Sequence, residues 1–250
     1  MKARSRIAAP MAAAAILVLL ASPSADALPV ISNGGFESGF ASWTRADQLG
    51  SEGTFMLQTG TASPVGGDPV PAPPEGTTAA MTDALGPGSH VLYQDFFVPL
   101  GGAILNFDLF LGNRANAFFT PANGTLDFST PALDQQARAD IIRTSADPFS
   151  VAAADVFLNL YQTKPGDPLI SGYNTITTDI SALLASQVGQ TLRLRFAETD
   201  NVLTFQMGVD NVRFGVPGVA VPEPASTLLF GAALAALVAA RRSGARRAMT

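Results

Sequence analysis

The side chains that most often carry out catalysis are scarce in this sequence. Its 250 residues contain no cysteine and a single histidine, His90. A zinc site built from histidines and a cysteine nucleophile are therefore excluded. A Ser-His-Asp triad would need His90, yet no Gly-x-Ser-x-Gly turn exists to present a serine. We interpret Gly88-Ser89-His90 as a loop that leads into a strand.

Carboxylates are the remaining candidates for acid–base chemistry. The chain has 20 aspartates and glutamates, and most glycoside hydrolases use two carboxyl groups placed on either side of the scissile bond. No motif or spacing in the sequence selects two of these acids. Hydrolysis therefore stays an alternative to a role without catalysis.

The N-terminal residues 1–27 have the features of a secretory signal helix. The basic start consists of Lys2, Arg4 and Arg6. Residues 7–21 are apolar, and Ala25-Asp26-Ala27 supplies small residues at the positions that a signal peptidase reads. Cleavage after Ala27 would make Leu28 the first mature residue. The alternative, an uncleaved anchor helix, is disfavoured by Pro10 and Pro23.

The C-terminal residues 222–250 form a second unusual segment. A Pro-rich motif stands at its start and consists of Val221, Pro222, Glu223 and Pro224. Residues 225–240 then carry no charge, and as a helix these 16 residues would span ~24 Å, a short transmembrane helix. The basic cluster that follows consists of Arg241, Arg242, Arg246 and Arg247, and it favours a cytoplasmic C-terminus. The alternative is a buried helix of the folded domain.

The order of motif, apolar span and arginines resembles the PEP-CTERM sorting tail of Gram-negative bacteria. The resemblance implies export, transient anchoring in the inner membrane and processing by an exosortase near Pro222–Pro224. It places the product at the cell surface or in an extracellular polysaccharide matrix. It also implies that Glu223 and its neighbouring prolines are recognised by the sorting enzyme and are not catalytic.

Residues 28–221 remain as one domain of about 190 residues, long enough for a sizeable core. The segments outside it hold 7 of the 15 basic residues and 2 of the 20 acidic ones, so the domain has 8 basic and 18 acidic residues and a net charge of −10. Such a surface repels nucleic acid, which we exclude as a partner, and suits divalent cations. Without disulfides, stability must come from the core, or from the core and a metal ion.

Short alternating runs between Gly and Pro turns indicate an all-β fold, an antiparallel β-sandwich. Strand patterns occupy residues 91–98, 103–111, 138–143, 154–161, 191–198 and 205–214, and residues 175–184 end in a short helical turn. In 191–198, we expect the leucines and Phe196 to point inward and Arg193, Arg195 and Glu198 to lie mostly outside. Val30 and Ile31 could begin a strand. Residues 49–88 are rich in loops, and the roles of loops 57–88 and 112–137 stay open.

Two stretches of the domain resemble jelly-roll carbohydrate-binding modules and related galactose-binding-like domains. The first stretch opens with Asn-Gly-Gly-Phe-Glu at residues 33–37 and reaches Trp43, which we expect in the core. The second contains Asp179-Ile180-Ser181, Gly189-Gln190 and Asp210-Asn211-Val212. The resemblance implies a jelly roll.

The same resemblance implies a structural calcium ion, in which an acid near the first strand meets an acid of the last strand. Glu37 and Asp210 occupy the matching positions, and backbone carbonyls would complete the six to eight oxygen ligands that Ca²⁺ takes. The alternative is that Glu37 accepts hydrogen bonds from turn amides and Asp210 pairs with a strand arginine.

Carbohydrate binding is the function that the resemblance implies. Tyr93, Tyr161 and Tyr173 are candidates for stacking on a sugar, although each could be a half-buried strand residue. The sequence thus favours an exported, exosortase-sorted, non-catalytic protein of the surface or exopolysaccharide matrix, with carbohydrate as its candidate ligand. The alternative is a secreted hydrolase that acts on matrix glycans.

Overall fold

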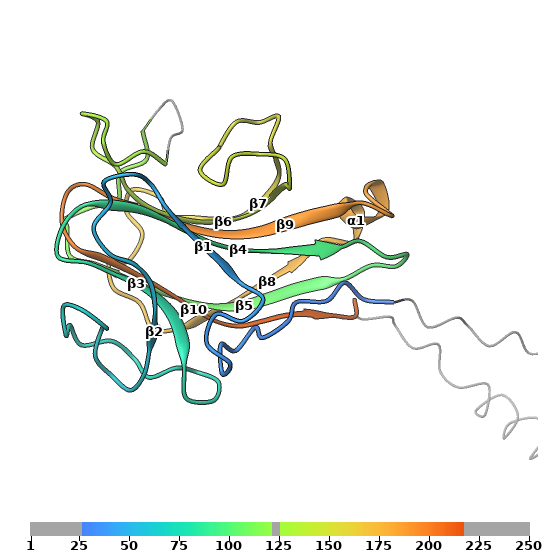
Figure 1. Cartoon of the computed structure of the whole chain (residues 1–250), viewed down its shortest axis with the longest axis horizontal. Helices are drawn as coiled ribbons and strands as arrows, with labels where there is room; N and C mark the ends of the chain where they lie inside the picture. The colour runs from blue at the N-terminus through green and yellow to red at the C-terminus, as the bar shows by residue number, and fades with distance from the viewer. Residues whose placement is uncertain (1–26, 122–125, 218–250) are drawn as a thin grey trace, which may run out of the picture.

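The computed structural model describes residues 27–121 and 126–217, which form a sandwich of two five-stranded antiparallel sheets (Figure 1). The expected signal helix over residues 1–26 and the tail from residue 218 onward lie outside the described residues. Within the part that is described, no helix is long and apolar enough to cross a membrane.

Sheet A has the strand order β1-β4-β9-β6-β7 and sheet B the order β2-β3-β10-β5-β8. The strands of sheet A are β1 (Thr44–Asp47), β4 (Gly88–Phe97), β9 (Thr191–Asp200), β6 (Gln135–Arg143) and β7 (Val156–Gln162). Those of sheet B are β2 (Thr54–Gln58), β3 (Ala79–Asp83), β10 (Phe205–Gly215), β5 (Ile104–Asn113) and β8 (Asn174–Asp179). The described residues contain one α-helix, α1 (Ser181–Ser186).

The pairing of the strands is that of a jelly roll. β3 pairs with β10, β4 with β9, β5 with β8 and β6 with β7, all antiparallel, so the chain from β3 to β10 follows one long hairpin that is divided between the two sheets. The β5–β10 and β6–β9 pairs complete the sheets. β1 and β2 each add one strand at an edge. The prediction of an antiparallel β-sandwich is confirmed.

The core between the sheets is built by the alternation that the sequence shows. In β5, Leu105, Phe107, Leu109 and Leu111 are buried in the main hydrophobic cluster, as a period of two predicts. Trp43 also belongs to this core, with its ring centroid 5.2 Å from that of Phe36. A single dense core thus joins the N-terminal segment to both sheets.

Three local predictions were wrong. Val30 and Ile31 belong to no strand, and residues 49–88 contain β2 and β3. These strands have only five residues each, and β3 is buried throughout, so it shows no alternation of apolar and polar residues. Glu198 shares the parity of Leu194 and Phe196, and it points between the sheets, fully buried.

Arg195 is a further correction, because it is also fully buried. Its side chain leaves the outer face of sheet A, as predicted, but the connection between β6 and β7 covers it. The guanidinium donates to the carbonyl oxygens of Pro148 and Ser150 in that connection, at 2.7 and 2.6 Å. A strand pattern shows which face a residue points from, but it does not show what folds over that face.

Candidate functional site

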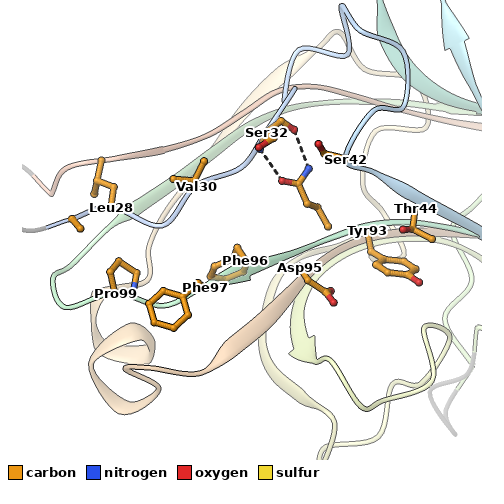
Figure 2. Close-up of a pocket in the computed structure, with 12 residues that line it drawn as sticks. Leu28, Val30, Ser32, Ser42, Thr44, Tyr93, Asp95, Phe96, Phe97 and Pro99 are labelled. Atoms are coloured by element: carbon orange, nitrogen blue, oxygen red, sulfur yellow. Dashed lines mark hydrogen bonds between the residues drawn. The ribbon is translucent and has the colours of Figure 1, made fainter.

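A hollow of about 750 Å³ lies between the N-terminal segment and the last residues of β4 (Figure 2). Its size is that of a small-molecule site. The lining combines hydroxyls, aromatic rings and one carboxylate: Ala27, Leu28, Val30, Ser32, Ser42, Thr44, Tyr93, Gln94, Asp95, Phe96, Phe97 and Pro99.

The hollow exists because β1 is shorter than β4. β1 pairs only with residues 90–93 of β4, so residues 94–97 have β9 on one side and no strand on the other. The side chain of Gln94 replaces the missing strand locally. It accepts from the amide of Ser32 at 2.7 Å and donates to the carbonyl of Ser32 at 2.9 Å, bonds that Figure 2 shows as dashed lines. Beyond this clamp the strand edge stays open.

The open end of β4 presents three side chains toward one face, since alternate residues of a strand share a side. Asp95 makes a bidentate pair with Arg193 of β9, at 2.6 and 3.0 Å. The same guanidinium stacks on Tyr93, with its carbon atom 4.0 Å from the ring centroid. Hydrogen bonding to Asp95 raises the pKa of Arg193. Phe97 completes the row, and 59% of its surface is exposed.

This arrangement suits binding better than acid–base catalysis. Asp95 is the one acidic residue among the residues that line the hollow, and Arg193 neutralises it. Glycoside hydrolysis normally needs two carboxyl groups across the bond. An exposed aromatic ring beside hydroxyls and an ordered charged pair can instead stack on a sugar ring and bond to its hydroxyls.

The three tyrosines predicted from the sequence as candidates for sugar stacking lie in different environments. Tyr93 lines the hollow, but one face of its ring is covered by Arg193. Tyr173 packs on Phe110, donates to Gln58 at 2.8 Å, and has a pKa that burial raises. Tyr161 is half-buried beside a smaller cavity of about 230 Å³. The structure therefore brings one of the three to the hollow.

The two stretches that carry the family resemblance meet in space. β10 has a bulge after Asp210, where Asn211 has a φ of 53°, and the next amide, that of Val212, donates to the carbonyl of Gly34 at 3.0 Å. A side chain at Gly34 would collide with the carbonyl of Val212, so glycine is needed for this approach. The bulge thus fastens the N-terminal segment to the last strand.

Glu37 and Asp210 both bind the loop segment 75–78 beside this junction. Thr77 and Thr78 donate their amides and hydroxyls to the Glu37 carboxylate at 2.8–2.9 Å. The amide bonds from Thr77 and Thr78 are the main cause that lowers the pKa of Glu37 to about 2. Asp210 accepts from the amides of Glu75 and Asn211. Each acid therefore has protein donors without a metal ion.

The surroundings of Asp210 bear on the calcium prediction. Burial raises the pKa of Asp210 to about 7, and the charges of Glu75 and Asp108 add to the effect. This crowding is what a divalent cation would relieve. Among the described residues, however, no three His, Asp or Glu side chains are grouped as a metal site. The predicted site takes its remaining ligands from backbone carbonyls, so calcium binding by Glu37 and Asp210 stays a prediction.

The sequence interpretation missed a group of interior acids, Asp134, Glu198 and Asp200, at the opposite end of the sandwich from the hollow. Burial raises the pKa of Asp134 and of Asp200 to about 7. Burial, then the charges of Asp200 and Asp134, raise that of Glu198 well above its usual range. The parity of β9 could have placed Glu198 inside. The hollow was missed because its open edge depends on where β1 begins.

The fold defines the described region as an all-β, jelly-roll sandwich protein. Comparison with protein families then shows that the chain carries a PEP-CTERM protein-sorting motif over residues 220–243. This match includes Val221–Pro224, Arg241 and Arg242, whereas Arg246 and Arg247 follow it. The motif indicates an exported protein that is sorted via the membrane. All of these residues lie outside the described part of the chain.

Several solved structures are similar to the sandwich at low identity. The K3 cleaved adhesin domain of Lys-gingipain from Porphyromonas gingivalis W83 has 16% identity and a TM-score of 0.44, over 76% of this chain and 97% of that one. TmCBM61, solved with β-1,4-galactotriose, has 10% identity and a TM-score of 0.38, over 76% of this chain and 100% of that one. CBM28, a module specific for non-crystalline cellulose, has 11% identity and a TM-score of 0.40, over 75% of this chain and 95% of that one. No curated protein matches the chain by sequence.

Proposed function

We propose that this chain is an exported, exosortase-sorted, non-catalytic protein of the cell surface or exopolysaccharide matrix that binds carbohydrate in the hollow beside β4. The sorting half of the proposal rests on the PEP-CTERM motif. The binding half rests on one observation, the open edge of β4 with an exposed Phe97 next to the Asp95–Arg193 pair.

Carbohydrate is the ligand class that this chemistry favours. A sugar ring has one apolar face, which stacks on an aromatic ring, and hydroxyls at its rim, which bond to carboxylates, guanidinium groups and hydroxyls. The hollow offers aromatic rings, hydroxyls and the Asp95 carboxylate within one concave surface, and the Arg193 guanidinium is paired to that carboxylate. A strongly anionic polymer is disfavoured, because the one guanidinium at the site is already paired and the domain carries a net charge of −10.

The sorting tail implies further partners. An exosortase and the inner membrane of a Gram-negative bacterium would hold the chain transiently, and the processed domain would then meet extracellular polysaccharide. Export would remove residues 1–27, and processing near Pro222–Pro224 would separate the sandwich from its membrane anchor. The product would be a soluble domain with the hollow open to the matrix.

The binding half is tested by a glycan array and titration with the processed form, residues 28–221. We expect a neutral polysaccharide or oligosaccharide to bind. Phe97→Ala should weaken binding about tenfold, because a stacked ring is worth ~0.5–1.5 kcal/mol beyond its buried area. Leu203→Ala is the matched control, since Leu203 is equally exposed but lies in the β9–β10 turn at the far end of the sandwich.

Two results would overturn the binding half. One is the absence of binding to any glycan on the array. The other is binding that Phe97→Ala and Asp95→Asn leave unchanged. Turnover of a polysaccharide by the same preparation would instead favour the secreted hydrolase.

A further inference from the structure

The two ends of the described chain leave the sandwich at the same end, which we call the exit end (Figure 1). β10 finishes here with Gly215 paired to Ile104, the first residue of β5. The position of a Cβ on Gly102, in the β4–β5 turn, would lie 3.2 Å from Pro217, so this turn packs against the departing chain. The sorting motif begins three residues further on, at residue 220.

The exit end carries little charge, unlike the rest of the domain. Four of its segments, residues 27–31, 98–103, 187–190 and 215–217, contain no Asp, Glu, Lys, Arg or His. The end of β8 adds one exposed carboxylate, Asp179, whose residue pairs with Ile104. The domain as a whole has 18 acidic and 8 basic residues. A tip with so few charges on so acidic a domain meets little of the electrostatic repulsion that would keep it from a lipid surface.

Each segment also exposes a large apolar side chain. These residues and their exposed fractions are Val30 (68%), Leu100 (72%), Val188 (41%) and Val216 (68%). The segments adjoin one another. Val98 exchanges backbone hydrogen bonds at 2.9 Å with Gly189 and Gln190, Gly102 lies against Pro217, and Val30 lines the hollow together with Pro99. The apolar residues therefore form the rim of one surface. Such surfaces mark contacts with other molecules or membranes.

The length of chain beyond Pro217 determines what this rim faces. Ala225, where the apolar run begins, is eight positions beyond Pro217, and eight Cα–Cα steps can span at most about 29 Å. While the apolar run is in a bilayer, the exit end is thus within that reach of the bilayer surface. The opposite end, with the β3–β4 and β9–β10 turns, points away.

We propose that the exit end rests on the lipid surface of the bilayer while the tail anchors the chain, so that Leu100, Val188, Val216 and Val30 contact the headgroup and acyl boundary. This inference rests on the proposed membrane anchoring of the tail. The contact orients the domain before processing, and cutting the tail releases it, because four small apolar contacts without a tether give only weak membrane binding.

The test uses the full chain, whose lack of cysteine allows single probes to be attached cleanly. An environment-sensitive fluorophore is placed at Leu100→Cys or Val216→Cys, and at Leu85→Cys as the control. Leu85 is 76% exposed and lies in the β3–β4 turn at the far end. The chain is reconstituted into phosphatidylcholine vesicles with brominated acyl chains, and flotation is measured in parallel. We expect several-fold stronger quenching at Leu100 and Val216 than at Leu85, with little dependence on salt.

Together, the outcomes distinguish the proposed lipid contact of the exit end from the anchoring of the tail. A chain that does not float with the vesicles overturns both. A chain that floats, with the probe at Leu100 quenched no more than the one at Leu85, overturns the contact alone. A second variant, Leu100→Glu with Val188→Glu, should still float but lose the quenching at Val216. Quenching at Val216 that this variant retains also contradicts the proposal.

Discussion

At the scale of single residues, the interior acids are the most unusual feature of the described chain. Glu198 and Asp134 are fully buried, and each keeps one carboxylate oxygen without a hydrogen-bond partner among the described residues. His90 lies next to them, with Nδ1 bonded to Asp47 at 2.8 Å and Nε2 without a partner. Buried carboxyls of this kind are most stable when protonated.

These acids make stability depend on pH in a defined direction. A pKa of about 7 in the folded state, against 3.8 for a free aspartate, means that the folded state binds more protons between pH 4 and 7. Stability therefore rises as pH falls from 8 to 5. Allowing for coupling among the groups, we expect a gain of ~2 kcal/mol, or a melting temperature higher by roughly 4–8 °C.

Below pH 4 the trend should reverse. Burial acts to raise the pKa of Asp140, but hydrogen bonds from Arg138 and the charges of Arg195 and Arg138 lower it overall. The stability that this carboxylate contributes is lost as pH falls through its lowered pKa. Scanning calorimetry from pH 3 to pH 8 measures both effects. A melting temperature that is higher at pH 8 than at pH 5 would contradict the role of the interior acids.

Glu198→Gln isolates the contribution of one interior acid. Glutamine has the same shape and no charge, so it should raise the melting temperature at pH 8 and flatten the dependence between pH 5 and 8. Glu52→Gln, at an exposed position, is the control and should do neither. If both variants behave like the unmodified chain in calorimetry, Glu198 is not a source of the pH dependence.

At the scale of elements, the buried Arg195 holds the β6–β7 connection over sheet A, and Asp140 links it to a second buried arginine, Arg138. Asp140 accepts two bonds from Arg138 at 2.7 Å and one from Arg195 at 2.5 Å. Arg195 in turn binds the carbonyls of Pro148 and Ser150. Asp140 is thus the one acid in direct contact with both buried cations within the described sandwich.

Asp140→Asn should destabilise the domain strongly, because it leaves two buried guanidinium groups without a counter-charge. We expect a loss of ~3–5 kcal/mol in the free energy of unfolding, measured by urea denaturation at pH 7. The matched control is Asp95→Asn, which breaks the partly exposed pair with Arg193 and should cost only ~0–1 kcal/mol. Equal losses in the two variants would show that burial of the Asp140 pair does not matter.

The junction of the N-terminal segment with β10 is where calcium would act. An ion that binds only the folded form stabilises it by ~2.7 kcal/mol at a hundred times its dissociation constant, about 5–10 °C for a domain of this size. Asp210→Asn should weaken the effect. If metal-free protein melts at the same temperature in EDTA and in excess Ca²⁺, no calcium site exists, and Glu37 serves only to hold Thr77 and Thr78.

The elements also show how far the sequence predicts this structure. β5 and β9 are predictable because apolar and polar residues alternate over a long run. A family resemblance makes the stretches Asn33–Trp43 and Asp210–Val212 predictable. β2 and β3 are too short to show a period, and β3 lies under the loop 59–78. The hollow depends on β1 beginning only at Thr44, opposite Tyr93, a tertiary fact that no local pattern in residues 44–47 contains.

At the scale of the whole molecule, the chain combines a folded sandwich domain with a separate sorting signal. The jelly roll provides a closed core and an open edge at β4, and the exit end leads directly to the motif at residues 220–243. The hollow and the exit end adjoin, because Val30 lines the hollow and is also exposed at the exit end. Glu223→Ala should leave the fold and glycan binding unchanged while the tail stays attached, which gel mobility and binding assays of membrane fractions can check.

Intact-mass analysis of protein released from the cell surface tests the sorting claim most directly. We expect a mature chain that begins at Leu28 and ends near Pro222–Pro224, and that is absent from the released fraction of an exosortase-deficient strain. A released form that still ends at Thr250 would contradict processing of the tail.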